Sequence, residues 1–214
     1  MRRGPITAVT VLVLIAGLCG GWIVSSMLNP RGPATASVEI PGFLWPDPPV
    51  VKDFTLRDHQ GHTFDRERLL GRWSLLYFGY THCPDACPTS LSVMREVEKL
   101  LLANPGFRDR FQGVFVSVDP ARDSLEHLGQ YVTHFSPRFI GATASEDSMA
   151  KTARDFGVMF QLTEPDEHGS YLVDHTSSFL LVDPQGRLVA VLRTPHEAAD
   201  LAARISRIER VVAG

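Results

Sequence analysis

Residues 74–91 of the chain read SLLYFGYTHCPDACPTSL, and this stretch decides the fold. Ser74 to Tyr80 is an apolar and aromatic run that is too short for a helix, which predicts a buried strand. Pro84 then ends the strand in a tight loop. Pro88 suits the first position of a helix, and apolar residues follow it every three or four positions, at Leu91, Met94, Val97 and Leu101. Cys83 and Cys87 therefore lie between the end of a strand and the start of an amphipathic helix.

This position favours thiolate chemistry, because the partial positive charge of a helix N-terminus stabilises the thiolate over the thiol. A thiolate is the nucleophile of disulfide exchange and also a ligand for soft metals. The spacing C-x-x-x-C is longer than the C-x-x-C of ordinary thiol–disulfide exchange proteins. In a helical turn it separates the Cβ atoms by ~5–6 Å, whereas a disulfide needs ~3.8 Å. The pair predicts redox chemistry, metal binding or both, and the spacing favours a metal.

Two sulfurs leave a metal site incomplete, so a third ligand is expected among the eight histidines of the chain. His82 adjoins Cys83, but neighbouring side chains usually point apart, so it is a spare ligand only. His175 precedes an expected strand, at the mouth of a sheet, where α/β proteins gather ligands. The neighbouring Asp174 could orient the metal site or balance its charge without itself being a ligand. The others are interpreted as solvated, packing or capping residues: His59, His62, His127, His134, His168 and His196.

The ligand set Cys83, Cys87 and His175 suits copper, especially Cu(I), and could also hold zinc. The competing interpretation is a plain stabilising disulfide between the two cysteines. Such a bridge would close a very short loop and stabilise the fold weakly, which favours the metal. A third interpretation is dithiol exchange that uses both cysteines without His175.

Composition excludes several other classes of protein. The chain has 214 residues, which is enough for one domain, and a formal charge of −3. Its three cysteines are too few for a disulfide framework. No basic run is present, so no nucleic-acid partner is predicted. Cys19 lies in an apolar run and is interpreted as an inert thiol.

The N-terminal region predicts a membrane anchor. Arg2 and Arg3 lie in residues 1–5 and precede Ile6 to Leu28, which carries no charge and exceeds the ~20 apolar residues that span a bilayer. The positive-inside rule places residues 1–5 in the cytoplasm and the bulk of the protein across the membrane. The setting we expect is a bacterial inner membrane, crossed once, with the folded domain in the periplasm. The alternative is a signal peptide cleaved at Ala34-Thr35-Ala36. Residues 29–49, rich in Pro, Gly, Ala and Ser, are interpreted as a linker.

The folded domain is expected over residues 50–214, as an α/β or α+β sandwich in which helices flank a mixed central sheet. Turn signals predict a hairpin at 54–64 and another that joins Thr176–Val182 to Leu188–Leu192. Further strands are predicted at Gly113–Val118 and Phe139–Gly141. Three more helices are predicted, one from a capping box of Asp123 and Glu126, one from Ser145, and one from a capping box of Thr194 and Glu197.

Three motifs in this order carry a resemblance to a known family: FGYTHCPDACP (78–88), VSVDPARDS (116–124) and VDHTSSFLLVDPQG (173–186). They resemble the SCO/SenC/PrrC family of membrane-anchored copper proteins. The resemblance implies a thioredoxin-like fold and a copper site, Cu(I) or Cu(II), made by Cys83, Cys87 and His175. It also implies a partner, the copper-site subunit of cytochrome c oxidase, to which copper is delivered or whose cysteines are reduced. An upstream copper donor or thiol reductant would then be a second partner.

Overall fold

The computed structural model describes residues 40–44 and 46–213. The predicted anchor at 6–28, Cys19 and most of the linker lie outside the described residues. Among the described residues, no helix is long and apolar enough to cross a bilayer. The compact unit begins at Ile40, so the last residues of the predicted linker belong to it. Leu44 donates a backbone hydrogen bond to Val189, and Ile40 is buried in the core.

The described part of the chain forms nine strands, four α-helices and one short 3-10 helix. The strands are β1 (Thr55–Asp58), β2 (Thr63–Asp65), β3 (Trp73–Gly79), β4 (Phe111–Ser117), β5 (Ile140–Thr143), β6 (Phe160–Leu162), β7 (Val173–His175), β8 (Phe179–Val182) and β9 (Leu188–Leu192). The helices are η1 (Arg66–Arg68), α2 (Ala86–Leu102), α3 (Leu125–Phe135), α4 (Glu146–Asp155) and α5 (Ala198–Ala213).

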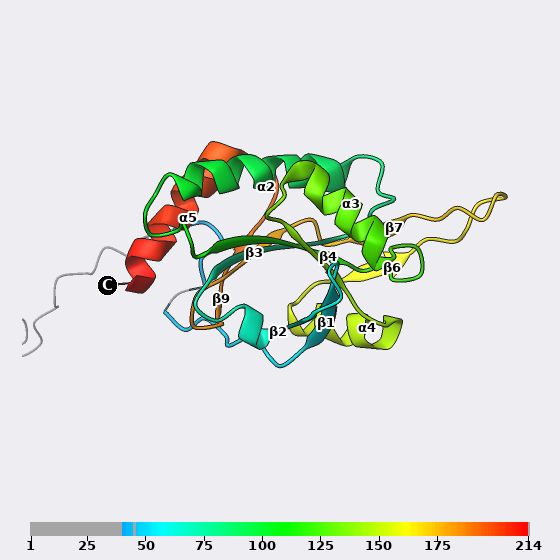
Figure 1. Ribbon diagram of the computed structural model, residues 1–214, viewed down its shortest axis with the longest axis horizontal. Helices are drawn as coiled ribbons and strands as arrows, with labels where there is room; N and C mark the ends of the chain where they lie inside the picture. The colour runs from blue at the N-terminus through cyan, green and yellow to red at the C-terminus, as the bar shows by residue number, and fades with distance from the viewer. Residues whose placement is uncertain (1–39, 45, 214) are drawn as a thin grey trace, which may run out of the picture. The chain divides into compact units, whose positions relative to one another are not determined.

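Seven strands build one mixed sheet in the order β2-β1-β5-β4-β3-β8-β9. Helices α2, α3 and α5 cover one face and α4 lies on the other (Figure 1). Every residue of β3 and β4 is buried, because both faces of the central strands are covered, and this explains their mainly apolar sequences. The prediction of a mixed sheet flanked by helices is confirmed.

Strand direction gathers three segments at one edge of this sheet. Strands β3 and β4 run parallel, so the residues that follow Gly79 and Ser117 emerge side by side. Strand β8 runs antiparallel to β3, with Phe179 opposite Tyr77, so the chain enters β8 at that same edge. The edge therefore receives the cysteine loop, the β4–α3 loop and the residues that precede β8.

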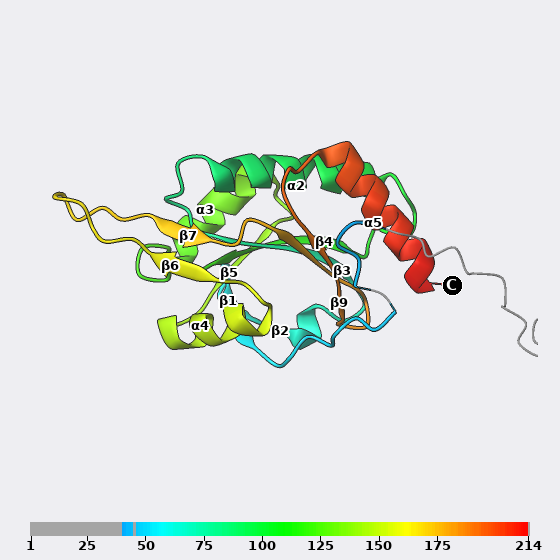
Figure 2. The ribbon, with the colours of Figure 1, turned by 180° about the vertical axis from the view of Figure 1, so that it is seen from behind.

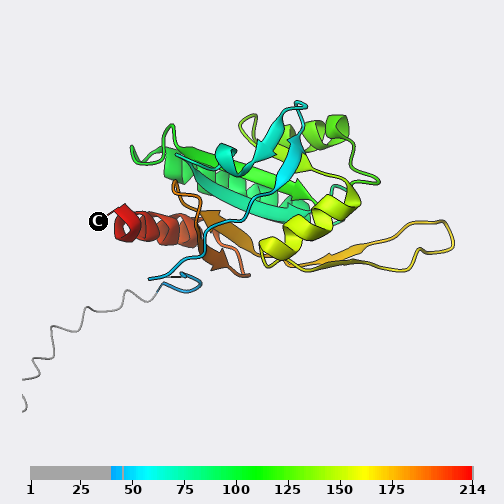
Figure 3. The same ribbon diagram turned by 90° about the horizontal axis from the view of Figure 1, so that it is seen from below.

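The smaller sheet, β6 paired with β7, forms a hairpin arm from Phe160 to His175 that extends away from the seven-stranded sheet (Figures 1, 2 and 3). The predicted strand over Thr176–Val182 is wrong in its first part, because β8 begins only at Phe179. His175 instead ends β7, at the root of the arm. The predicted hairpin of this strand with Leu188–Leu192 is confirmed as β8–β9.

Three predicted helix starts are wrong. Helix α2 begins at Ala86, so Pro88 occupies the third position, where an N–H would still have no partner within the helix. Ser124, not Asp123, caps α3 by accepting from the backbone N–H of His127, and Asp123 is buried. Helix α5 begins at Ala198, so Thr194 and Glu197 form no capping box.

Candidate metal centre

Cys87 lies in the first turn of α2 and is completely buried against β3. A Cβ atom at Gly79 would lie 2.8 Å from Cys87 Sγ and 2.9 Å from the Phe115 ring, so the glycine makes room for the sulfur. Burial raises the pKa of the Cys87 thiol well above its ordinary value. Cys87 therefore holds its proton unless a metal or a reaction removes it.

Cys83 lies in the loop before α2 and is partly exposed. Burial disfavours its thiolate, but the backbone N–H groups of Cys87, Asp85 and Ala86 outweigh that effect and lower the pKa of Cys83. The backbone N–H of Cys87 donates to Cys83 Sγ at 3.4 Å. Both cysteines are free thiols, so the structure shows an accessible, acidic thiol beside an enclosed, less acidic one.

His175 reaches the cysteines from the root of the arm. Its Nδ1 atom lies 3.2 Å from the carbonyl oxygen of Thr176, which can only accept, so Nδ1 carries the proton. The lone pair is therefore on Nε2, which lies 3.5 Å from Cys87 Sγ. The imidazole meets the rings of Tyr77 and Tyr80 edge to face, at centroid distances of 5.8 and 6.1 Å. Burial lowers the pKa of His175 and so favours the neutral ring that a metal requires.

The structure thus brings together the three residues that the sequence selected. The ligand atoms of Cys83, Cys87 and His175 all lie within 4.8 Å of one another. Among the described residues, this is the one group of three or more Cys, His, Asp or Glu side chains that could hold a metal ion. Two sulfurs and one imidazole nitrogen suit a soft ion, as in copper sites.

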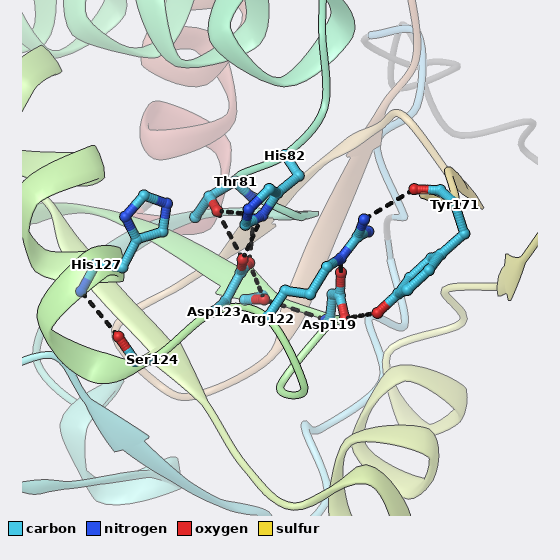
Figure 4. A network of polar contacts seen from close by, with 9 residues as sticks. Thr81, His82, Asp119, Arg122, Asp123, Ser124, His127 and Tyr171 are labelled. Carbon is cyan, nitrogen blue, oxygen red and sulfur yellow. Dashed lines mark hydrogen bonds and ion pairs between the residues drawn. The ribbon is translucent and has the colours of Figure 1, made fainter. Parts of the chain in front are cut away.

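His82, the spare ligand of the sequence analysis, does not belong to the group formed by the three ligand atoms. Its Nδ1 atom lies 3.3 Å from the Asp123 carboxylate and 3.1 Å from the Thr81 hydroxyl (Figure 4). It also faces His127, with ring centroids 5.6 Å apart.

Asp174 has the electrostatic effect on His175 that a neighbouring carboxylate should have. Burial is the largest influence and lowers the pKa of His175, while the negative charge of Asp174 acts in the opposite direction.

Sequence reasoning missed the polar network beside the site, which Figure 4 shows. Asp123 accepts hydrogen bonds from Thr81 and Ser117, and Asp119 accepts from Arg122 and Tyr171. The available signal was the motif VSVDPARDS, whose two acidic residues follow a buried strand directly. The D-x-x-E pattern at Asp123 also matches a helix cap, and for that reason the sequence analysis did not assign Asp123 to a buried polar network.

A cleft of ≈ 710 Å³ opens on the other side of His175, between α4 and the arm. Met159, Phe160 and Thr176 line it together with Ala153 and Arg154. Met159 is 79% exposed, and Leu162 and Leu172 of the arm are about half exposed. Among these exposed apolar side chains, Met159 lines the same cleft as His175.

The fold and the site together define the class of protein: a thioredoxin-like domain with a candidate soft-metal site at the carboxyl ends of its central strands. The family model SCO1/SenC matches residues 46–210. The chain is 36% identical over 181 residues to the mitochondrial protein SCO2 homolog of Bos taurus, covering 84% of this chain and 66% of that protein. It is 32% identical over 188 residues to an SCO2-like protein of Rickettsia felis, covering 87% and 89%.

Among solved structures, the chain is similar to Arabidopsis thaliana ScoI with copper bound. That likeness has a TM-score of 0.71 and 33% identity, and covers 75% of this chain and 98% of that one. The chain spans about half to two thirds of the length of the vertebrate mitochondrial relatives it matches. The chain belongs to the SCO1/SenC family.

Proposed function

We propose that this domain binds one copper ion through Cys83, Cys87 and His175 and passes it to the copper-site subunit of cytochrome c oxidase. The observation that carries the proposal is the meeting of three ligand atoms within 4.8 Å, from segments far apart in the sequence. The copper bound in the related ScoI of Arabidopsis supports the choice of metal. The oxidase partner follows from the family resemblance of the three sequence motifs.

The protonation states suit the loading of copper. Cys83, with its lowered pKa, offers a thiolate to an incoming ion, and neutral His175 offers the Nε2 lone pair. Cys87 must lose its proton as the ion binds, so loading releases a proton. Delivery is then an exchange of ligands, in which an acceptor's side chains replace these three.

The proposed setting is the periplasmic face of a bacterial inner membrane. Ile6–Leu28 would hold the domain there, and the part of the predicted linker before Ile40 would be the tether. An upstream copper donor or a thiol reductant would keep the site loaded or reduced. The exposed apolar side chains of the arm, beside His175, are where such partners would make contact.

The test is a copper titration of the reduced domain, residues 40–214, with metal content and absorption as readouts. We expect one copper per wild-type domain, and affinities weakened at least about tenfold in His175→Ala, since loss of a ligand exceeds the usual cost of losing a supporting group. His168→Ala removes an exposed histidine of the same arm and is the matched control. Wild-type affinity in either His175→Ala or Cys87→Ser would overturn the proposal.

A second candidate function is reduction of the cysteines of the oxidase copper site, and the contrast between the two thiols favours it. The Cys83 thiolate would attack a partner disulfide, forming a mixed disulfide and releasing one partner thiolate. Cys87, once deprotonated, would attack Cys83 Sγ and release the second partner thiolate. The partner gains two electrons, and Cys83 and Cys87 become a disulfide.

The two functions separate at His175, which the reductase does not need. If His175→Ala abolishes oxidase assembly in cells while the Cys83–Cys87 reduction potential stays at the wild-type value, copper delivery is the function. If assembly persists in His175→Ala and fails in Cys83→Ser, the reductase is.

A further inference from the structure

The two halves of the candidate site come from different structural units. Cys83 and Cys87 join β3 to α2, at the centre of the seven-stranded sheet. His175 ends β7, which belongs to the separate two-stranded sheet of the arm. Something must therefore set the arm at the distance that lets Nε2 reach the sulfurs.

The polar contacts between the arm and the β4–α3 loop come from Arg122 and Asp119. Arg122 Nη1 donates to the backbone carbonyl of Tyr171 at 2.9 Å, and its guanidinium lies 3.5 Å from the centre of the Tyr171 ring. The Tyr171 hydroxyl donates to Asp119 Oδ1 at 2.9 Å, while Arg122 Nε donates to Asp119 Oδ2 at 2.5 Å. Tyr171 lies four residues before His175, in the segment of the arm that leads into β7.

These contacts are shielded from water, so their electrostatic part is strong. The Asp119 side chain is 1% exposed and that of Arg122 is 22% exposed. A charged pair of this kind, with a cation against an aromatic ring, gains strength when it is desolvated. The guanidinium also lies 5.6 Å from the Tyr80 ring, which itself faces the imidazole of His175.

The same loop is fixed to the cysteine side by Asp123. Its buried carboxylate accepts from the Thr81 N–H at 3.0 Å, the Thr81 hydroxyl at 2.6 Å and the Ser117 hydroxyl at 2.5 Å. Thr81 lies two residues before Cys83. Residues 119–123 therefore touch both halves of the site, one through Asp123 and the other through Asp119 and Arg122 (Figure 4).

We propose that Asp119, Arg122 and Tyr171 form a brace that positions His175 against Cys87. The three are positioning residues, since none of them contributes a ligand atom to the group of Cys83, Cys87 and His175. With the brace released, the arm moves relative to the sheet and the site keeps two sulfurs without the imidazole. The brace rests on the copper binding proposed above.

The test compares Arg122→Gln and Tyr171→Phe with wild type, each in the native and in the His175→Ala background. A positioning residue acts through the ligand it positions, so its effect must vanish when that ligand is gone. We expect Arg122→Gln to weaken copper binding about tenfold, the usual cost of losing a supporting group outside the ligands. Tyr171→Phe should weaken it about fivefold, the equivalent of one hydrogen bond. Neither should change the affinity of His175→Ala by more than about twofold, the scatter of additive mutants.

A second readout uses the metal-free domain. Hydrogen exchange of the amides of residues 159–176 should accelerate in both variants, because the arm loses its tie to the sheet. The Cys83–Cys87 reduction potential should stay at the wild-type value. Arg187→Gln is the matched control, because Arg187 makes a similar pair with buried Asp183 at 2.6 Å in the β8–β9 turn, away from the arm.

The outcomes separate the brace from the proposed function. Wild-type copper affinity in both Arg122→Gln and Tyr171→Phe, with His175→Ala impaired, overturns the brace alone. Equal losses in both backgrounds show general destabilisation and also overturn it. Wild-type affinity in His175→Ala overturns the ligand set and the brace together. Should Arg122→Gln fail to fold, Tyr171→Phe decides, since it removes a single hydroxyl and keeps the ring.

Discussion

The cysteine half and the histidine half of the site are held in place by different means. Cys87 is buried where α2 packs on the central strands, so its position follows from the core of the domain. His175 belongs to an arm outside the seven-stranded sheet and is placed by a few polar and aromatic contacts. A change on the cysteine side should therefore destabilise the domain as a whole, whereas a change on the histidine side should loosen the site and leave the rest of the fold as stable as before.

The largest expected effect tests the cysteine side through Asp123. Asp123→Asn keeps the shape but replaces one acceptor oxygen by an NH₂ donor, which then faces the hydroxyls and N–H of Thr81 and Ser117. Breaking a buried charged network of this kind costs roughly 2–4 kcal/mol of unfolding free energy. Denaturant unfolding of the metal-free domain measures it.

Asp166→Asn is the control for this change. Like Asp123, Asp166 is a carboxylate that accepts several hydrogen bonds, in its case from the backbone N–H groups of His168 and Ser170. Unlike Asp123, it lies exposed near the tip of the arm. We expect a loss below about 1 kcal/mol there, since water replaces the lost contacts. Equal losses at Asp123 and Asp166 would contradict the contrast between a core-held half and an arm-held half.

The next effect tests the close contact beneath Cys87. Gly79→Ala places a methyl group 2.8 Å from the sulfur and 2.9 Å from Phe115, so the helix or the strand must shift. Overpacking of this kind costs about 1–3 kcal/mol, and copper affinity should fall with it because the sulfur moves. Thermal unfolding and copper titration measure the two effects.

The comparison variant is Gly106→Ala. A Cβ there would meet the flexible end of Glu209 at 3.3 Å, and the side chain can give way. Its stability and copper affinity should match the wild type. A Gly79→Ala domain as stable as Gly106→Ala would show that Cys87 is not tightly enclosed.

The smallest effect concerns pH and the histidine side. Burial lowers the folded-state pKa of His175 below the unfolded value of 6.5, so the unfolded chain binds its proton first. The contribution of His175 to stability is then complete above pH 6.5 and is lost as pH falls toward the folded pKa. In the metal-free domain, His175→Gln should make unfolding free energy depend less steeply on pH below 6.5.

The His175→Gln variant should retain part of this pH dependence, because burial also lowers the pKa of His196. Unfolding curves at a series of pH values, with a chelator present, provide the measurement. An unchanged pH slope in His175→Gln would mean that the arm leaves the imidazole in water, and the histidine half would be looser than the structure shows.

Sequence patterns predicted the parts of the fold whose physics is local. Strands β3, β4 and β8 are mainly apolar runs, and helix α2 shows its period in Leu91 and Met94. The ligand trio could be selected by chemistry, since thiolates at a helix start need a third donor. The three motifs then made the family recognisable.

The arm and the polar network could not be predicted in this way. Strands β6 and β7 have three residues each, FQL and VDH, with mixed polarity and partial exposure, so they carry no period. Tyr171 lies 52 residues from Asp119, and no local pattern reports a hydrogen bond over that separation. Asp123 matched a helix cap in sequence, while its real partners are Ser117 at the end of β4 and Thr81 just beyond the end of β3, and these two strands pair only in the folded sheet.

If copper is passed on as proposed, the complete enclosure of Cys87 restricts the order in which the ligands are exchanged. An acceptor can approach the ion from the open side, past partly exposed Cys83 and His175, but not past a sulfur walled in by β3 and α2. We expect Cys83 to bind an incoming ion first and Cys87 to be the last ligand that releases it. The copper ion would thus leave from the side of Cys83 and His175. An acceptor that had replaced only those two ligands would still be linked to this domain through the Cys87 thiolate.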